Sequence, residues 1–237
     1  MEHSLEKPFV LSSRSEVEQF EQMSYAYAET RANFAIKHLS LVEAFDFCQQ
    51  REDGGKVFAA TLDIFINFVI LWCDTIAAGA VWNEKFSKGR LEGGSVLESH
   101  EKFFGKMDMH RHNTAFIFRY RALWDKIMGV LIMIHAPERY EVFVSAKSRR
   151  RAFIKYSEGV EALPKDAVMY ITSMLEGFDN EFRTPETHGT GALRKWSFTM
   201  APLNEVPSGK LMNFWNIALD GMIALSGSLG QAIQAPD

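Results

Sequence analysis

The stretch that decides the fold is NTAFIFRYRALWDKIMGVLIMIH, residues 113–135. Its apolar side chains recur every three or four positions, which places them on one face of an α-helix: Phe116, Tyr120, Leu123, Ile127, Val130 and Ile134. Pro137 follows closely and is expected to end this helix. Because an apolar helix face must be covered by other apolar elements, the stretch predicts a bundle of helices built around it.

Helical periodicity continues on both sides of this stretch. We expect further helices over residues 15–50, 56–88, 96–109, 138–156, 164–180 and 208–234. Ser15 and Glu18 have the pattern of a capping box at the first of them, and the pair Gly54-Gly55 is expected to break the chain before the second. Alternating apolar and polar runs bounded by turn residues are nearly absent. The sequence therefore predicts an all-α fold: one domain over residues 1–237, a helical bundle with extra helices, with residues 1–14 as an N-terminal extension.

The composition is that of a folded, soluble protein. Of 237 residues, 47% are hydrophobic and 24% are charged, so a core can form without a disulfide or a structural metal.

Residues 57–82 are long and apolar enough to cross a bilayer, but Asp63 and Asp74 would each cost about 2.5–3.5 kcal/mol near its centre. A buried core helix is favoured. Cys48 and Cys73 lie in apolar stretches, and we expect both to be buried free thiols. From the residues at its N-terminus we expect no signal peptide. We expect a cytoplasmic protein without membrane contact.

The segment after residue 181 carries the most suggestive chemistry. Arg183 and His188 are separated by four residues that include Pro185, and two glycines follow. A permanently charged arginine can stabilise charge on a phosphate, while a histidine can exchange a proton near neutral pH. Together they suffice for RNA cleavage without a metal. The alternative is structural, an ion pair of this loop with Glu181 or Glu186.

The wider segment FRTPETHGTGALRKWSF, residues 182–198, resembles the HEPN superfamily in this helical context. These helical domains carry an Arg-x(4–6)-His motif near the start of a late helix, and LWDK, residues 123–126, is similar to a segment of their central helix. The resemblance implies a homodimer whose two motifs meet in a cleft and form a metal-independent endoribonuclease centre, with Arg183 and His188 catalytic and no cofactor.

The resemblance leaves a binding role open as well. Other members of the superfamily bind RNA or nucleotides only, and many belong to toxin–antitoxin or defence systems, which implies a protein antitoxin as a possible partner. Thr184 departs from the pattern, because many active members have Asn, Asp or His directly after the arginine. No tyrosine stands two residues after His188, so modification of such a tyrosine is not supported.

Positive charge is unevenly distributed. The formal net charge of -4 excludes a protein that coats nucleic acid through bulk charge. Two local groups could still contact RNA: the stretch from Lys147 to Lys155, with Arg149, Arg150 and Arg151, and the run Arg194, Lys195 and Trp196, in which the tryptophan could stack on a base. A solvated helix face is the alternative for the first group.

Three cations on the central stretch need partners because their neighbours are apolar. They are Arg119, Arg121 and Lys126, and the candidate carboxylates are Asp125, Glu181 and Glu186.

Two other classes of function compete with the nuclease hypothesis. Asp108, His110 and His112 alternate along the chain and would project to one side of an extended segment, as ligands of a hydrolytic metal could. Exposed polar residues of a loop are the alternative there. The other class is a non-catalytic interaction module that presents its last helix, in which glycines and serines recur, to a protein partner. HExxH, CxxC, P-loop, GxGxxG and GxSxG patterns are all missing.

Overall fold

The all-α prediction is confirmed. The structure, a computed structural model, describes residues 11–32, 39–85, 96–191, 193–195, 220, 222, 225 and 227–233. These residues are mostly helical and include no strand. The buried apolar side chains form one continuous cluster to which all the layers contribute.

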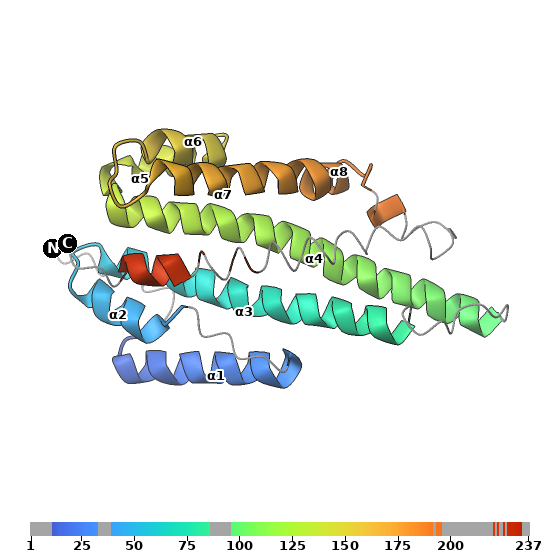
Figure 1. The fold of residues 1–237 in the computed structure, drawn as a ribbon. Coiled ribbons are helices and arrows are strands. Elements are labelled where there is room, and N and C mark those ends of the chain that lie inside the picture. Colours follow the sequence, from blue (N-terminus) through green and yellow to red (C-terminus); the bar gives the residue numbers. More distant parts are fainter. Residues whose placement is uncertain are drawn as a thin grey trace.

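Two long antiparallel helices form the centre of the molecule, α3 (Gly54–Lys85) and α4 (Val96–His135). They pack along much of their length (Figure 1). Phe65 on α3 and Phe116 and Trp124 on α4 are among the largest fully buried side chains. The stretch that predicted the core therefore lies in it.

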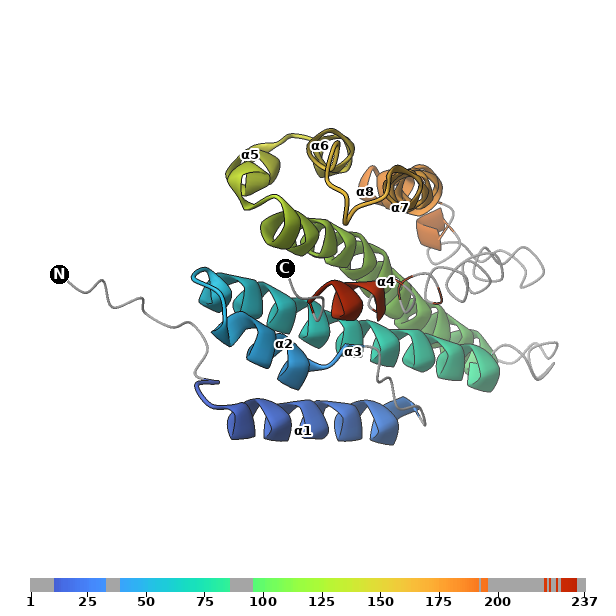
Figure 2. The same cartoon turned by 60° about the vertical axis from the view of Figure 1, so that its left-hand side comes forward.

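Smaller helices cover the two sides of this pair. On the side of α3 lie α1 (Arg14–Ala32) and α2 (Leu41–Gln49). On the side of α4 lie α5 (Tyr140–Ser145), α6 (Arg149–Tyr156) and α7 (Lys165–Phe178). Figure 2 shows the two groups on opposite sides of the α3–α4 pair. A 3-10 turn, Pro137–Arg139, joins α4 to α5.

The first expected helix is two helices. α1 ends at Ala32 and α2 starts after Ser40, whose hydroxyl accepts a hydrogen bond from the Glu43 amide at 3.3 Å. The capping box is also displaced by two residues. Ser13 accepts from the Glu16 amide at 3.3 Å, and the Glu16 carboxylate accepts from the Ser13 amide at 3.0 Å, whereas Ser15 and Glu18 lie inside α1. Both serines fit the pattern, and the structure uses the earlier one.

Two further boundaries were wrong. Residues 96–109 and 113–135 belong to a single helix, α4, so the expected loop around residues 110–112 is helical. Conversely, residues 138–156 are split into the 3-10 turn, α5 and α6, because the chain is extended at Ala146 and Ser148 caps a new helix. α1 begins at Arg14, one residue before the expected start of the first helix. Of the expected last helix, residues 208–219 lie outside the described residues.

The polar residues of α3 face cations on α4. Asp63 pairs with Lys126, Asn67 accepts from Arg119 at 3.2 Å, and the Arg119–Asp74 ion pair measures 3.6 Å. Among the described helices, α3 passes the length and hydropathy test for crossing a membrane, with 39% of its most apolar window buried. Its carboxylates Asp63 and Asp74 pair with cations of α4.

Candidate functional site

Arg183 lies in a π turn, not in the loop that the sequence suggested. The turn, Asp179–Arg183, directly continues α7 and leads into the short helix α8 (Thr184–Thr187). Pro185 explains the change of helix type, since it lacks an amide hydrogen and its ring would clash with the carbonyl of Glu181 in a regular α-helix. A π turn widens the helix at that point and removes the clash.

An aromatic column holds this turn against α4. The ring of Phe178, at the end of α7, lies 4.5 Å from the ring of Tyr120 and 5.7 Å from the ring of Phe182. Tyr120 is itself stacked on Phe116 at 5.4 Å. Because Phe116, Tyr120 and Phe178 are buried, the column fixes where the π turn starts and hence where Asp179 projects.

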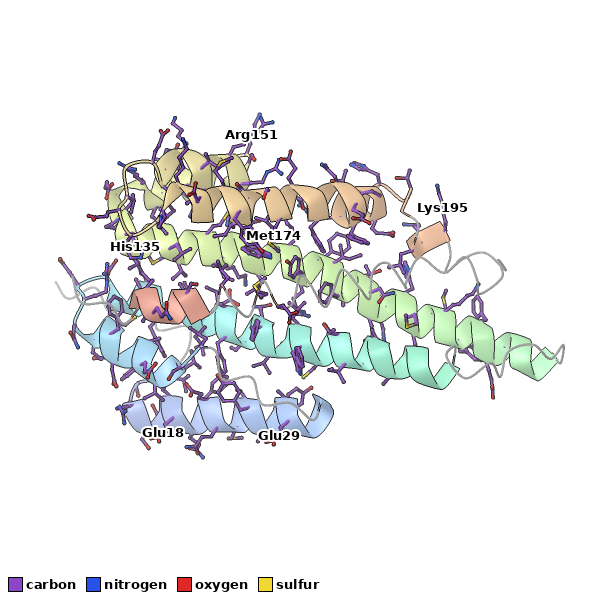
Figure 3. All side chains as sticks on the ribbon, viewed as in Figure 1. Glu18, Glu29, His135, Arg151, Met174 and Lys195 are labelled. Carbon is purple, nitrogen blue, oxygen red and sulfur yellow. The ribbon has the colours of Figure 1, made fainter. Side chains whose placement is uncertain are left out.

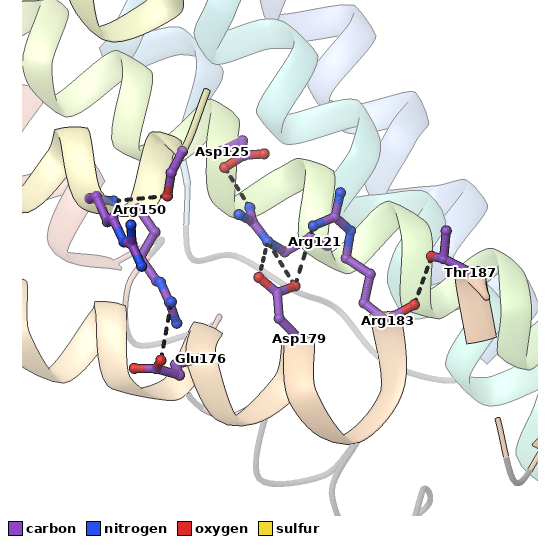
Figure 4. Close-up of polar contacts among 9 residues, drawn as sticks. Arg121, Asp125, Arg150, Glu176, Asp179, Arg183 and Thr187 are labelled. Atoms are coloured by element: carbon purple, nitrogen blue, oxygen red, sulfur yellow. Dashed lines mark hydrogen bonds and ion pairs between the residues drawn. The ribbon is translucent and has the colours of Figure 1, made fainter. Parts of the chain in front are cut away.

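Asp179 connects two arginines. Its carboxylate accepts from Nε of Arg121 at 3.0 Å to each oxygen, and Nη1 of Arg183 lies 3.7 Å away (Figure 4). Arg121 also pairs with Asp125 one turn along α4. The side chain of Arg121 is 9% exposed and that of Arg183 is 45% exposed. Arg121 is therefore a buried, satisfied cation, whereas Arg183 remains accessible to a ligand.

These residues line an open pocket of about 470 Å³ between α4, the α5–α6 connection and the π turn. Six of its side chains are basic, and they come from segments far apart in the sequence: Arg121, Lys126, Lys147, Arg149, Arg150 and Arg183. Two, Asp125 and Asp179, are acidic. The lining therefore carries four more positive than negative charges in a chain whose total is -4. Such a concentration of positive charge is suited to an anion.

The α6 edge of the pocket is built around a helix start. The hydroxyl of Ser148 accepts from the Arg151 amide at 3.4 Å, which satisfies one of the amides left unbonded in the first turn. Arg149 donates to the carbonyl of Val144 at 3.4 Å, and Arg150 pairs with Glu176 of α7 at 3.2 Å. At the other end of α6, Arg139 donates to the carbonyl of Tyr156 at 2.6 Å and anchors the helix.

The structure brings only part of the predicted site together. Arg183, Arg149 and Arg150 share the pocket, and Arg151, one residue further along α6, is exposed on the outer side of the helix (Figure 3). The stretch from Lys147 to Lys155 is therefore not one strip. The helix break before Arg149 turns its first cations inward, toward the pocket.

His188 lies at the exposed end of α8 and does not line this pocket. Its amide donates to the carbonyl of Thr184 at 3.1 Å, and the Thr187 hydroxyl donates to the carbonyl of Arg183 at 2.7 Å. Gly189, with φ of 71°, ends the helical turn in a conformation that favours glycine. One subunit thus presents His188 to solvent, near Arg183 in sequence but outside its pocket.

The basic run after the motif is also exposed. Arg194 and Lys195 lie on a short helical segment beyond α8 (Figure 3), and Trp196 lies outside the described residues. Neither cation lines the pocket of Arg183. Arg194 instead lies beside the end of the motif, since a Cβ on Gly189 would be 3.7 Å from its Nη1.

The structural alternative was an ion pair of the motif with Glu181 or Glu186, and the carboxylate that pairs with Arg183 is neither of these. Arg183 pairs with Asp179, while Glu186 accepts from the amide of Leu193 at 3.0 Å. Gly191 makes that contact possible, because a Cβ there would lie 1.9 Å from Oε1 of Glu186. Of the three cations that needed partners, Arg121 uses Asp125, as expected, and Arg119 and Lys126 use carboxylates of α3.

Asp108, His110 and His112 do not project to one side. They lie on α4, where positions i and i+4 share a face and position i+2 faces away. Asp108 pairs with Arg111 at 3.7 Å, and His112 lies 4.0 Å from Asp74 of α3. Burial lowers the pKa of both histidines. No group of three or more metal-ligating side chains is placed to hold an ion among the residues that the structure describes. The segment is thus neither extended nor a loop, as the two alternatives required.

Asp179 and Ser148 contribute to the site but were not predicted from the sequence. Ser148 directly precedes a basic helical run, a pattern that could have indicated an N-cap. Asp179 carried no such signal, because its role depends on α7 packing across α4. No protein-family model, curated protein or solved structure matches the chain, so the candidate site is defined by its own geometry.

Proposed function

We propose that this protein is an RNA-binding protein of HEPN-like type that cleaves RNA without a metal. The observation that supports the proposal best is the position of Arg183, accessible in a pocket lined by six basic side chains. Arginine binds phosphate oxygens through two parallel hydrogen bonds, and the Asp179 carboxylate restrains its guanidinium at the pocket.

In this proposal the two motif residues have separate tasks. Arg183 holds the scissile phosphate and stabilises the charge that develops on it, whereas His188 transfers a proton to or from a ribose oxygen. Asp179 and Arg121 are positioning residues, since they act through Arg183. Because His188 lies outside the pocket of its own subunit, a homodimer that places it beside the partner's pocket completes the centre.

The direct test measures cleavage of a labelled single-stranded RNA in EDTA. We expect Arg183→Ala and His188→Ala each to lower the cleavage rate at least about 100-fold, the lower range for a lost acid–base group. Arg151→Ala is the matched control, because this exposed arginine belongs to the same basic stretch but not to the pocket. Equal rates in all four proteins would contradict the mechanism.

Binding must be measured beside cleavage. If the wild type binds RNA without cleaving it, and Arg183→Ala no longer binds it, the function is RNA binding alone. The dimer is tested by light scattering after size-exclusion chromatography. Mixing Arg183→Ala with His188→Ala chains should then restore cleavage, because one of the two composite centres regains both residues. Absence of a dimer would contradict the composite centre.

A further inference from the structure

We propose that the pocket of Arg183 binds a phosphate monoester, and that the 5′-phosphate end of an RNA strand is its source. The inference rests on the proposed function in so far as the ligand is RNA. The proposal concerns the terminal phosphate of the strand, whereas the Arg-x4-His motif acts on a phosphate within the strand.

The charge balance of the pocket favours a dianion. Six basic side chains line it, and Asp125 and Asp179 offset two of them. Two more carboxylates at its edge are engaged by lining cations, Asp63 by Lys126 and Glu176 by Arg150. Six cations against four carboxylates leave an excess of two positive charges. A phosphate monoester carries about -1.5 to -2 at neutral pH, whereas an internal phosphodiester carries a single negative charge.

The uncompensated donors gather at the α6 edge. The amides of Arg149 and Arg150 are the first two of α6, where no intrahelical acceptor exists, and Ser148 already serves the third. Nη1 of Arg150 is buried and has no hydrogen-bond partner. Lys147 is exposed and forms no ion pair among the described residues. These donors suit an anion with three terminal oxygens, placed at the positive end of a helix.

The opposite wall carries Arg183, held by Asp179 over the buried Arg121. The volume of about 470 Å³ lies within the range of small-ligand pockets and leaves room for the terminal nucleotide beside its phosphate. In this arrangement the α6 edge holds the terminal phosphate, and Arg183 is left for the next phosphate along the strand. The 5′ end would thereby fix which bonds reach the centre.

The experiment compares two versions of one oligoribonucleotide, with a 5′-phosphate or a 5′-hydroxyl and a fluorophore at the 3′ end. Binding is followed by anisotropy with full-length His188→Ala protein, so that the RNA stays intact. We expect the 5′-phosphorylated strand to bind at least about 10-fold more tightly. The double variant Arg149→Gln, Arg150→Gln should reduce this ratio to about 1, and Lys147→Gln, which removes an exposed side chain only, should lower it in part.

Arg151→Gln is the control, since its side chain lies outside the pocket, and it should leave the ratio unchanged. Equal affinity for the two strands in the parent protein would overturn the inference and leave the proposed function standing. If neither strand binds, the proposed function fails. Calorimetry with 5′-AMP and adenosine then decides the inference separately: binding of 5′-AMP alone, lost in the double variant, supports a monoester site for a free nucleotide, and binding of neither overturns it.

Discussion

At the scale of single residues, Asp179 stabilises the two arginines that it contacts, Arg121 and Arg183. Asp179→Ala would leave Arg121, 9% exposed, with Asp125 as its remaining carboxylate partner. Breaking a buried ion pair costs roughly 3–5 kcal/mol, and the surviving partner should reduce this to about 2–3 kcal/mol of unfolding free energy. Urea denaturation measures it, with the exposed Glu161→Ala as a control that should change by less than about 0.5 kcal/mol. Equal midpoints for Asp179→Ala and wild type would contradict this.

Cys48 provides a pH-dependent prediction. Burial raises the pKa of its thiol from near 9 to about 12. Between these values the unfolded chain loses the proton and the native protein keeps it, so stability falls as pH rises above 9, by up to about 1.4 kcal/mol per pH unit. Below pH 9 the thiol is protonated in both states and contributes no pH dependence.

The check is the unfolding free energy of wild type and Cys48→Ala between pH 7 and 10.5. The difference between the two proteins should be constant up to about pH 9 and should then shift against the wild type. Tyrosines titrate in both proteins and cancel in this difference. Parallel curves over the whole range would mean that the thiol ionises in the native state as easily as in the unfolded chain.

The ion-pair partner of a residue could be predicted from the sequence where the two residues are close along the chain. Asp125 lies one helical turn from Arg121, and helix periodicity alone places the two together. Asp179 lies 58 residues away, and its contact requires the aromatic column to set α7 on α4. Likewise, Arg149 and Arg183 were singled out separately, but nothing in their local sequence indicates that they share one pocket.

At the scale of elements, the junction of α2 and α3 depends on one of two adjacent glycines. A Cβ on Gly54 would lie 1.7 Å from the carbonyl oxygen of Cys48, a backbone atom that cannot turn aside, whereas a Cβ on Gly55 would meet nothing within 4 Å. We expect Gly54→Ala to lower the melting temperature strongly. Gly55→Ala should raise stability by about 0.5–1 kcal/mol, because alanine is the better helix former. Similar effects of the two substitutions would contradict this account.

Several helix boundaries differ from those that the sequence predicts, and each difference has a local cause. Gly54-Gly55 was expected to separate helices, but Gly54 begins α3 and is required for a close approach. The polar residues near His110 suggested a loop, yet α4 continues through them, and Met109 and Asn113 on either side are buried.

At the scale of the whole molecule, the contrast between a net charge of -4 and a positive pocket predicts a weak dependence of RNA binding on salt. Each phosphate neutralised on a single strand contributes about -0.7 to the slope of log K against log salt. With two or three such contacts we expect a slope of about -1.5 to -2. A slope steeper than about -4 would indicate a broad basic surface and would contradict a local site.

The π turn between α7 and α8 has a consequence for how the sequence can vary. A π turn holds one residue more than the α-helical turn it replaces, so it advances the angular phase of everything after it by about 100°. Deleting one residue from Asp179–Arg183 would return this segment to α-helical register, in which the ring of Pro185 meets a backbone carbonyl, and would rotate the guanidinium of Arg183 away from α6. A substitution in this turn at a position other than Asp179 or Arg183 can spare the site, whereas a change in the length of the turn removes the site while leaving the bundle intact.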